Sequence, residues 1–315
     1  MPLKNHIRTI LATIKLVLEY GVPAYVLYFG ESLGDNLMLT TISAALNERG
    51  YQNIWIKCNR QDLFKYNPAI RLVLPFDALL SSFVLRLFKV RLVSPVYTHY
   101  NRETDQDTIP EKHIILKMAD SIPLKGPIAN KPVFNLDRTE EQKGCISARQ
   151  IAIVTSTSGA KVPMQNKEWL TGRYQQIVNK FSGNYQFIQL GTAADQPLAN
   201  VLDLRGKTTI RESAAILKNS MLMIGHVGFM MHLARAVDCR SVIIYGGREK
   251  PAQSGYECFQ NISSVVACSP CWLHNRCNFE RMCMTLISAE MAEDAVLSQL
   301  QLFGTPLNID ILNNE

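Results

Sequence analysis

Short apolar runs alternate with helical segments along much of this chain, and this alternation limits its possible folds more than any other feature. The first unit runs from an apolar stretch at 22–29, through a loop at 30–34 and a helical stretch at 35–48, to a second apolar stretch at 51–57. Strand–helix–strand units of this kind build parallel sheets with right-handed crossovers. The pattern therefore predicts an α/β fold, preceded by a helix over 5–20.

The same alternation returns in the second half of the chain. The elements expected there are strands at 150–155, 185–190, 221–225 and 241–245, and helices from about Lys167, from Thr209 and over 229–237. Thr209 and Glu212 have the spacing of a capping box, which marks the start of a helix.

The stretch between the halves, residues 96–148, is more polar and contains several prolines, so a domain junction is expected near Gln142–Arg149. Two similar α/β halves predict two Rossmann-like domains, over 1–145 and 146–315, that face a central cleft.

Composition narrows the class of protein. With 47% hydrophobic and 19% charged residues, the chain is typical of a folded globular protein, and its net charge of +6 is modest for a dedicated nucleic-acid binder. Residues 1–92 carry 11 Lys and Arg against 6 Asp and Glu, and include the apolar stretch 79–85. Such a basic, apolar face suits an anionic membrane surface, although an ordinary solvated face explains it equally simply.

Targeting and redox features point to the cytoplasm. No stretch reaches the roughly 18 apolar residues of a membrane span, and the N-terminal stretch lacks a signal-peptide core because Lys15 and Glu19 interrupt it. We expect a cytoplasmic protein, with peripheral contact to the inner membrane as a further hypothesis. In a reducing compartment, the eight cysteines favour thiols and a metal site over disulfides.

Four of these cysteines stand close together with the spacing C-x2-C-x5-C-x5-C: Cys268, Cys271, Cys277 and Cys283. A tetrahedral soft metal such as Zn²⁺ needs four thiolate or imidazole ligands on a short, turn-rich stretch. The cysteines alone leave open whether such a clip stiffens a loop, binds nucleic acid or takes part in chemistry.

An acidic residue stands where the first strand gives way to a helix. Asp35 follows Gly34 at this carboxyl edge, where ligands bind in open α/β sheets. A helix cap is the simpler interpretation, since Asp satisfies the first N–H groups of a helix, and the two roles are compatible.

Three further segments are candidates for a phosphate or nucleotide site. Residues 155–161 follow a strand with small hydroxylated residues and a glycine, although they lack a Walker ending, and a plain loop explains them equally well. Lys167 is a candidate phosphate ligand or an ordinary surface lysine. The segment 225–236 places His226 in a loop as the more exposed histidine and His232 on a helix, where a packed histidine is the alternative. Gly246 and Gly247 permit close backbone approach.

Taken together, these segments resemble glycosyltransferase family 9, the heptosyltransferase-like enzymes of bacterial surface-polysaccharide assembly. The matching elements are Ser32–Asn36 (S-x-G-D), Asn166–Trp169 (K-x-W), Leu204–Thr209, His232–Ala236 (H-L-A-x-A), Tyr245–Gly247 and the cysteine pattern that ends at Cys283–Met284. Their order and spacing, rather than any single element, carry the resemblance.

The resemblance implies a GT-B fold, with an N-terminal acceptor domain and a C-terminal nucleotide-sugar donor domain that also holds the cysteines and a final helix. It implies inverting transfer without a catalytic metal, with Asp35 as the base and Lys167 stabilising phosphate. The donor-binding residues expected are Ser158, Gly159, Lys161, His226, Gly228, His232, Gly246 and Gly247.

One departure from the family pattern concerns the donor. The family usually has D-[ST]-G before the helix histidine, and here the acidic position reads Val227, or His226 with one extra loop residue. ADP-heptose is therefore one donor among several, and the acceptor is expected to be a lipopolysaccharide, O-antigen or capsule precursor, lipid-linked or polysaccharide. The alternative is a non-catalytic nucleotide-sugar-binding or scaffold protein of the same fold. A zinc ribbon that binds nucleic acid is disfavoured by the charge. The cysteine cluster is expected to be a structural Zn or Fe clip, or else reduced thiols packed in a loop.

Overall fold

The structure, a computed structural model, describes residues 3–315; Met1 and Pro2, which open the N-terminal stretch discussed above, lie outside the described residues. Two compact units make up the chain. The first consists of Met1–Val96, Ile115–Asn135 and Ile311–Glu315, and the second of Tyr97–Ile114 and Leu136–Asp310. The expected boundary at residue 145 falls inside the second unit.

The first unit is built on a parallel sheet in the order β3-β2-β1-β4. Val26 lies opposite Trp55 and Leu92 in this sheet, and Val26 and Trp55 are buried with Val17 in one hydrophobic cluster. Its elements are α1 (Leu3–Tyr20), β1 (Tyr25–Tyr28), α2 (Leu33–Glu48), β2 (Ile54–Lys57), η1 (Gln61–Leu63), β3 (Ile70–Leu74), α3 (Ser82–Leu87), β4 (Arg91–Val93), α4 (Ile114–Ala119, whose first residue belongs to the second unit), β7 (Gly126–Ala129) and β14 (Ile311–Asn314), which pairs with β7 in antiparallel fashion.

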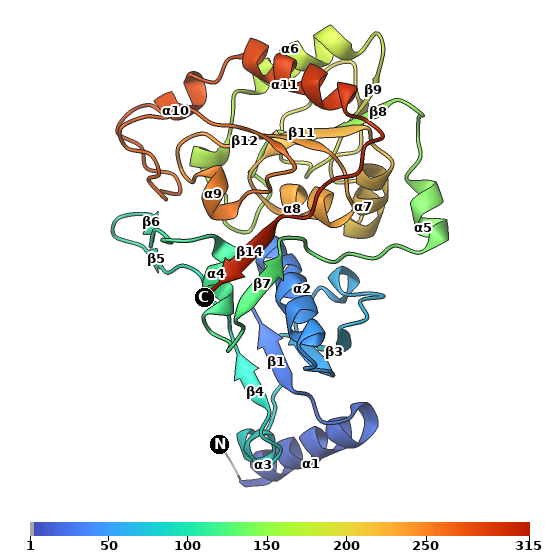
Figure 1. Cartoon of the computed structure of the whole chain (residues 1–315), viewed down its shortest axis with the longest axis vertical. Coiled ribbons are helices and arrows are strands. Elements are labelled where there is room, and N and C mark those ends of the chain that lie inside the picture. Colours follow the sequence, from blue (N-terminus) through green and yellow to red (C-terminus); the bar gives the residue numbers. More distant parts are fainter. Residues whose placement is uncertain (1–2) are drawn as a thin grey trace. The chain divides into compact units, whose positions relative to one another are not determined.

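The second unit holds a six-stranded sheet in the order β10-β9-β8-β11-β12-β13, with every pair parallel. Helices α6 and α11 cover one face of this sheet, and α7 and α8 cover the other (Figure 1). Its elements are β5 (Tyr100–Asn101), β6 (Gln106–Asp107), α5 (Arg138–Lys143), β8 (Gln150–Ile153), η2 (Gln165–Lys167), α6 (Thr171–Phe181), β9 (Gln186–Gln189), β10 (Leu202–Asp203), α7 (Ile210–Lys218), β11 (Leu222–His226), α8 (Phe229–Ala236), β12 (Ser241–Ile244), α9 (Pro251–Ser254), β13 (Gln260–Ile262), α10 (Met282–Thr285) and α11 (Ala289–Gln301). The predicted α/β fold with parallel sheets is confirmed.

Local signals explain where the helices begin. Thr209 caps α7, and its capping box with Glu212 is present as predicted. The helix expected from Lys167 is wrong: Lys167 ends the short 3-10 turn η2, and α6 begins only at Thr171. Glu168, between them, has an extended backbone, because its carboxylate is held by the neighbouring loop 156–157 and cannot follow a helical path.

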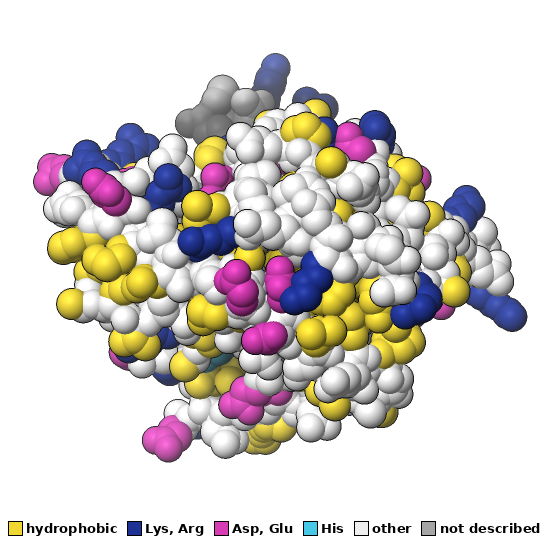
Figure 2. Space-filling view, turned by 90° about the horizontal axis from the view of Figure 1, so that it is seen from above, with side chains coloured by type: hydrophobic (Ala, Val, Ile, Leu, Met, Phe, Trp, Pro, Cys, Tyr) yellow, Lys and Arg dark blue, Asp and Glu magenta, His cyan; other side chains and the backbone are white. Residues whose placement is uncertain are grey.

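The surface is mixed in character. Seen from above, charged side chains of both signs lie among hydrophobic and uncharged ones (Figure 2). Within the described part of the chain, no helix combines the length and the hydrophobicity needed to cross a membrane.

Candidate functional site

The carboxyl edge of the second unit's sheet gathers most of the predicted site residues. Strands β8, β11 and β12 are neighbours in this sheet, and all three run in the same direction. The loop after β8, the turn after β11 at 227–228 and the turn after β12 at 245–249 therefore leave the sheet at one edge. This is the edge where open parallel sheets bind their ligands.

Lys167 is held at this edge by a buried acid that sequence reasoning missed. Its Nζ atom lies 2.7 Å from Oε1 of Glu249, and only 15% of the Lys167 side chain is exposed. The same Glu249 oxygen accepts a hydrogen bond of 2.9 Å from the buried guanidinium of Arg248. Lys167 is therefore not the ordinary surface lysine of the simpler interpretation.

The charge of Glu249 is fixed by these two cations. Burial by itself disfavours the carboxylate, but Lys167 and then Arg248 outweigh burial and lower the pKa of Glu249 to about 2. Glu249 is thus a carboxylate at neutral pH, and it orients the Lys167 ammonium by a charge-assisted hydrogen bond.

The pair extends into a longer chain of buried charges. Asp107 on β6 accepts hydrogen bonds from Arg248 and from His274, the latter at 2.7 Å. The Arg248 guanidinium also lies 4.8 Å from the centre of the Trp272 ring. The hairpin β5–β6 and the segment after β13 therefore hold Arg248 rigidly, and through it Glu249. No local sequence pattern marks these partners, since Asp107 and Arg248 are 141 residues apart.

Two histidines lie close enough to Lys167 to respond to its charge. Burial, with Lys167 as the next cause, lowers the pKa of His226 to about 4 and that of His232 to about 3. Both imidazoles are therefore neutral at pH 7. His232 Nδ1 lies 2.7 Å from the Tyr256 hydroxyl, so His232 is the packed histidine of the simpler interpretation.

His226 differs from its expected setting. It is the last residue of β11 and is buried, rather than exposed in a loop. In the part of the chain that the structure describes, its Nδ1 atom has no hydrogen-bond partner. Gly228 lies directly beside its ring, since a Cβ atom at Gly228 would stand 3.8 Å from Nε2.

The loop after β8 is tied down by two carboxylates. Oε1 of Glu168 accepts hydrogen bonds from the Ser156 hydroxyl at 3.0 Å and from the Thr157 hydroxyl and N–H at 2.9 and 3.0 Å. Glu168 thereby links this loop to Lys167, the residue before it.

The second carboxylate, Asp195, accepts the Ser158 hydroxyl at 2.9 Å. The Ser158 N–H donates to Ser156, so both donors of Ser158 are engaged inside the loop. A Cβ atom at Gly159 would stand 2.0 Å from the Thr192 hydroxyl oxygen, which explains why glycine is needed there. Lys161 lies exposed in the same loop.

The two glycines after β12 lie against the cysteine segment. Gly246 has φ of +61°, and a Cβ atom there would stand 2.6 Å from the Met284 side chain. A Cβ atom at Gly247 would stand 2.8 Å from Cβ of Cys283. The close approach that they permit is therefore to the cysteine segment.

The cysteine segment is bonded to the turn that carries Glu249. Cys271 N–H donates to Gly247 O at 3.1 Å, and Trp272 N–H donates to Arg248 O at 2.9 Å. The segment thus buttresses the turn after β12 and lies next to the carboxyl edge of the sheet.

The four clustered thiols influence one another electrostatically. Burial raises the pKa of Cys271 and of Cys283, and nearby cysteine thiols, including Cys268 for both, add to the rise. Thiolate chemistry suits Zn²⁺ or Fe. However, among residues 3–315, no three His, Cys, Asp or Glu side chains lie close enough together to hold an ion. The predicted metal clip therefore stays a prediction.

Asp35 lies in the first unit, in the first turn of α2, after β1 ends. The cap of α2 is Ser32 rather than Asp35: the Ser32 hydroxyl accepts the Asp35 N–H at 3.4 Å. The side-chain amide of Asn36 donates to the carbonyls of Phe29, Gly30 and Ser32, which fixes the loop before the helix. Asp35 is half-buried in the first turn of α2, a setting that suits either a structural or a chemical role.

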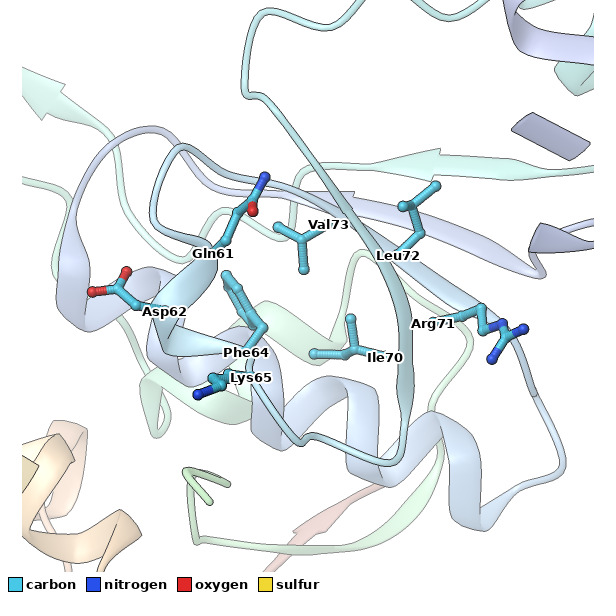
Figure 3. A pocket seen from close by; sticks show the side chains of 8 residues that line it. All are labelled: Gln61, Asp62, Phe64, Lys65, Ile70, Arg71, Leu72 and Val73. Atoms are coloured by element: carbon cyan, nitrogen blue, oxygen red, sulfur yellow. The ribbon is translucent and has the colours of Figure 1, made fainter. Parts of the chain in front are cut away.

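A separate pocket of about 400 Å³ opens in the first unit between η1 and β3. Figure 3 shows Phe64, Ile70 and Val73 facing one another, with Asp62 and Arg71 pointing away to either side. The residues predicted to act in transfer lie on other elements.

Comparison with known proteins finds a family profile that matches part of the chain. The profile of glycosyltransferase family 9 (heptosyltransferase) matches residues 127–281, whereas no curated protein matches the chain. A family 9 glycosyl transferase from Veillonella parvula DSM 2008 is 15% identical with a TM-score of 0.62, and the match covers 88% of this chain and 97% of that one.

Two Escherichia coli proteins have similar structures. The iron-containing dodecameric glycosyltransferase TibC from enterotoxigenic E. coli H10407 is 15% identical with a TM-score of 0.66, covering 89% of this chain and 76% of that one. ADP-heptose lps heptosyltransferase II is 13% identical with a TM-score of 0.63, covering 88% and 98%. At these identities the likeness establishes the fold, and the profile match is confined to residues 127–281, just under half of the chain. The chain is therefore a glycosyltransferase with the GT-B fold, and its residues 127–281 match the family 9 (heptosyltransferase) profile.

Proposed function

We propose that this glycosyltransferase moves a heptose or a related sugar from a nucleotide diphosphate to a lipopolysaccharide, O-antigen or capsule acceptor, with inversion at the anomeric carbon. The observation that carries the proposal is the position of Lys167 at the carboxyl edge of the second unit's sheet, oriented by Glu249. A similar structure, that of heptosyltransferase TibC, was solved in complex with ADP-D-beta-D-heptose, which supports a donor of this class.

The proposed reaction needs two charge movements. The Asp35 carboxylate takes the proton of the acceptor hydroxyl, and the freed oxygen bonds to the anomeric carbon from the side opposite the diphosphate. The bond from that carbon to the diphosphate oxygen breaks, and its electron pair leaves with the diphosphate. Lys167 stabilises the negative charge that develops there.

The donor's identity depends on the departure at His226. We take His226, rather than Val227, as the residue at the usual acidic position, and its buried imidazole is neutral at pH 7. A neutral imidazole presents one N–H donor and one acceptor, whereas a carboxylate presents acceptors only. We therefore propose that the donor is a nucleotide diphosphate sugar. The donor group beside His226 would either accept a hydrogen bond from the imidazole or both donate and accept one.

We also propose that the cysteine cluster binds a structural Zn or Fe ion. Its spacing, the mutual influence of its thiols and the iron-containing relative support this proposal. The ion is proposed to take no part in the transfer.

The deciding experiment is a thermal-shift screen of the purified protein against ADP, UDP, GDP and TDP sugars, repeated with Lys167→Ala. We expect one nucleotide class to stabilise the protein, and the shift to shrink in the variant. Transfer is then assayed with the stabilising donor. Stabilisation without transfer to any acceptor would favour the non-catalytic alternative, and an undiminished shift in Lys167→Ala would contradict the role of the lysine.

A further inference from the structure

The helix α1 has two apolar faces, of which one is used in the fold. Thr13 and Val17 are buried against the first unit, and Leu16 and Tyr20 pack on the same hydrophobic cluster. The Thr13 hydroxyl also accepts the N–H of Ser81 at 2.9 Å, which fixes α1 to the start of α3. This face explains why α1 is held on the sheet.

The second apolar face of α1 is open to solvent. Ile7, Leu11, Ile14 and Leu18 recur at steps of four, three and four residues, so they form one stripe along the helix. Leu11 is 61% exposed and Leu18 82% exposed. Isolated exposed leucines are ordinary, but a regular stripe of four aliphatic side chains marks an interaction surface.

The neighbouring helix α3 adds to this surface. Helices α1 and α3 pack against each other (Figure 1). Phe83 and Leu87, one turn apart on α3, are exposed, and Leu87 has 65% of its area in solvent. We call these six side chains the α1–α3 surface: Ile7, Leu11, Ile14, Leu18, Phe83 and Leu87.

Positive charge flanks the α1–α3 surface. At 100° per residue, Lys4, Arg8 and Lys15 fall on one side of the α1 stripe, and all three are exposed. Arg86 and Lys89 are exposed beside Phe83 and Leu87. The acidic residue of α1 is Glu19 alone. An apolar stripe with long basic side chains along its edge is the pattern of a helix that lies in a membrane interface.

We propose that the α1–α3 surface docks on an anionic lipid bilayer, with the apolar stripe in the interfacial region and the basic side chains on the phosphate groups. The charge decides against a second copy of the chain as the occupant. A second copy would add the same basic residues, Lys4, Arg8 and Lys15, with Glu19 as the one acidic side chain of its α1, so it would not neutralise them. An anionic lipid surface complements the same charges.

Vesicle sedimentation tests this proposal. The full chain is mixed with vesicles of phosphatidylcholine alone, or with about one third phosphatidylglycerol. We expect binding to the anionic vesicles only, weakened by high salt. Leu11→Gln with Leu18→Gln should lower the partition coefficient at least about tenfold. The combined charge reversal Lys4→Glu, Arg8→Glu and Lys15→Glu should remove the preference for phosphatidylglycerol.

Matched controls separate docking from general surface hydrophobicity. Leu297→Gln with Leu302→Gln changes two exposed leucines at the end of α11 and should leave binding unchanged. Equal binding by the Leu11/Leu18 variant, no binding by the natural chain, or a dimer in solution that the Leu11/Leu18 variant loses would each overturn the proposal. The readout needs no donor or acceptor, so its outcome is independent of the proposed transfer reaction.

Discussion

Lys167 and Glu249 form an ion pair of 2.7 Å between the η2 turn and the turn after β12. The sequence singles out the lysine alone, but the structure makes the two residues one unit. Because Glu249 also accepts a hydrogen bond from Arg248, removing its charge leaves two cations without their shared anion. The stability and the donor affinity of the protein should therefore depend on both members of the pair.

Glu249→Gln should destabilise the protein by about 3 kcal/mol, the usual cost of breaking a buried ion pair from one side. Chemical denaturation at pH 7 measures this value. Lys167→Met completes a double-mutant cycle, in which the double variant should lose clearly less than the sum of the single losses. Glu257→Gln, at an exposed acid, is the matched control and should change stability little. Additive losses in the cycle would contradict the coupling.

Three buried histidines should make the fold sensitive to mild acid. Burial lowers the pKa of His113 and His226 to about 4 and that of His232 to about 3. The ordinary pKa of a histidine is 6.5. As the pH falls below this value, the three histidines become protonated in the unfolded chain but stay neutral in the folded chain. The free energy of unfolding is therefore highest, as far as these histidines are concerned, above about pH 6.5. It should fall by about 3 kcal/mol for each histidine as the pH drops toward about 4.

Urea unfolding at several pH values from about 7.5 to about 5 measures this loss, and its slope should correspond to an uptake of about three protons on unfolding near the acid end. Glu249 adds to the loss only below its ordinary value of 4.5, because its folded pKa is about 2. His113→Asn, which removes the imidazole that lies 3.1 Å from the Gly255 carbonyl oxygen, should reduce the slope by about one proton. Constant stability across this range would contradict the neutral, buried state of the histidines.

Local signals in the sequence were enough for several elements of the second unit and for the edge of its sheet, but not for the partners within the site. The capping box of Thr209 and Glu212 and the apolar runs of β8, β11 and β12 are short-range features, and the structure agrees with them. The ion pair of Lys167 joins residues far apart in the chain, and so does the contact of Arg248 with Asp107. Contacts between residues so far apart produce no periodic or local pattern in the sequence.

The setting of His226 also depended on tertiary packing. The sequence placed it in a loop, whereas β11 extends through it and buries it beside β12. Nothing local in the sequence shows that Met284 and Cys283 fill the space beside the glycines after β12.

Asp35→Asn should lower the rate of transfer by about a thousandfold, because it removes the proposed base and leaves the geometry of the turn intact. Donor affinity should be unchanged, and thermal stability should fall only slightly, since an acid in the first turn contributes about 0.5 kcal/mol. Ser32→Ala is the matched control: it removes the cap of α2 and should cost about 1 kcal/mol of stability while transfer is retained. Near-normal turnover by Asp35→Asn would refute the assignment of Asp35 as the general base.

The cysteine cluster should bind about one metal ion per chain, and elemental analysis of protein purified without chelators measures the content. Cys271→Ser and Cys283→Ser should both lose the ion and melt at a lower temperature, whereas Cys145→Ser, at an exposed thiol outside the cluster, should do neither. Chelation should lower donor affinity only together with stability, because Cys271 and Trp272 hold the turn that carries Glu249 by hydrogen bonds to Gly247 and Arg248. If the metal-free protein has the same melting temperature as the protein purified without chelators, the cysteines are packed thiols. If metal removal abolishes transfer but leaves stability and donor binding unchanged, the ion acts in the chemistry.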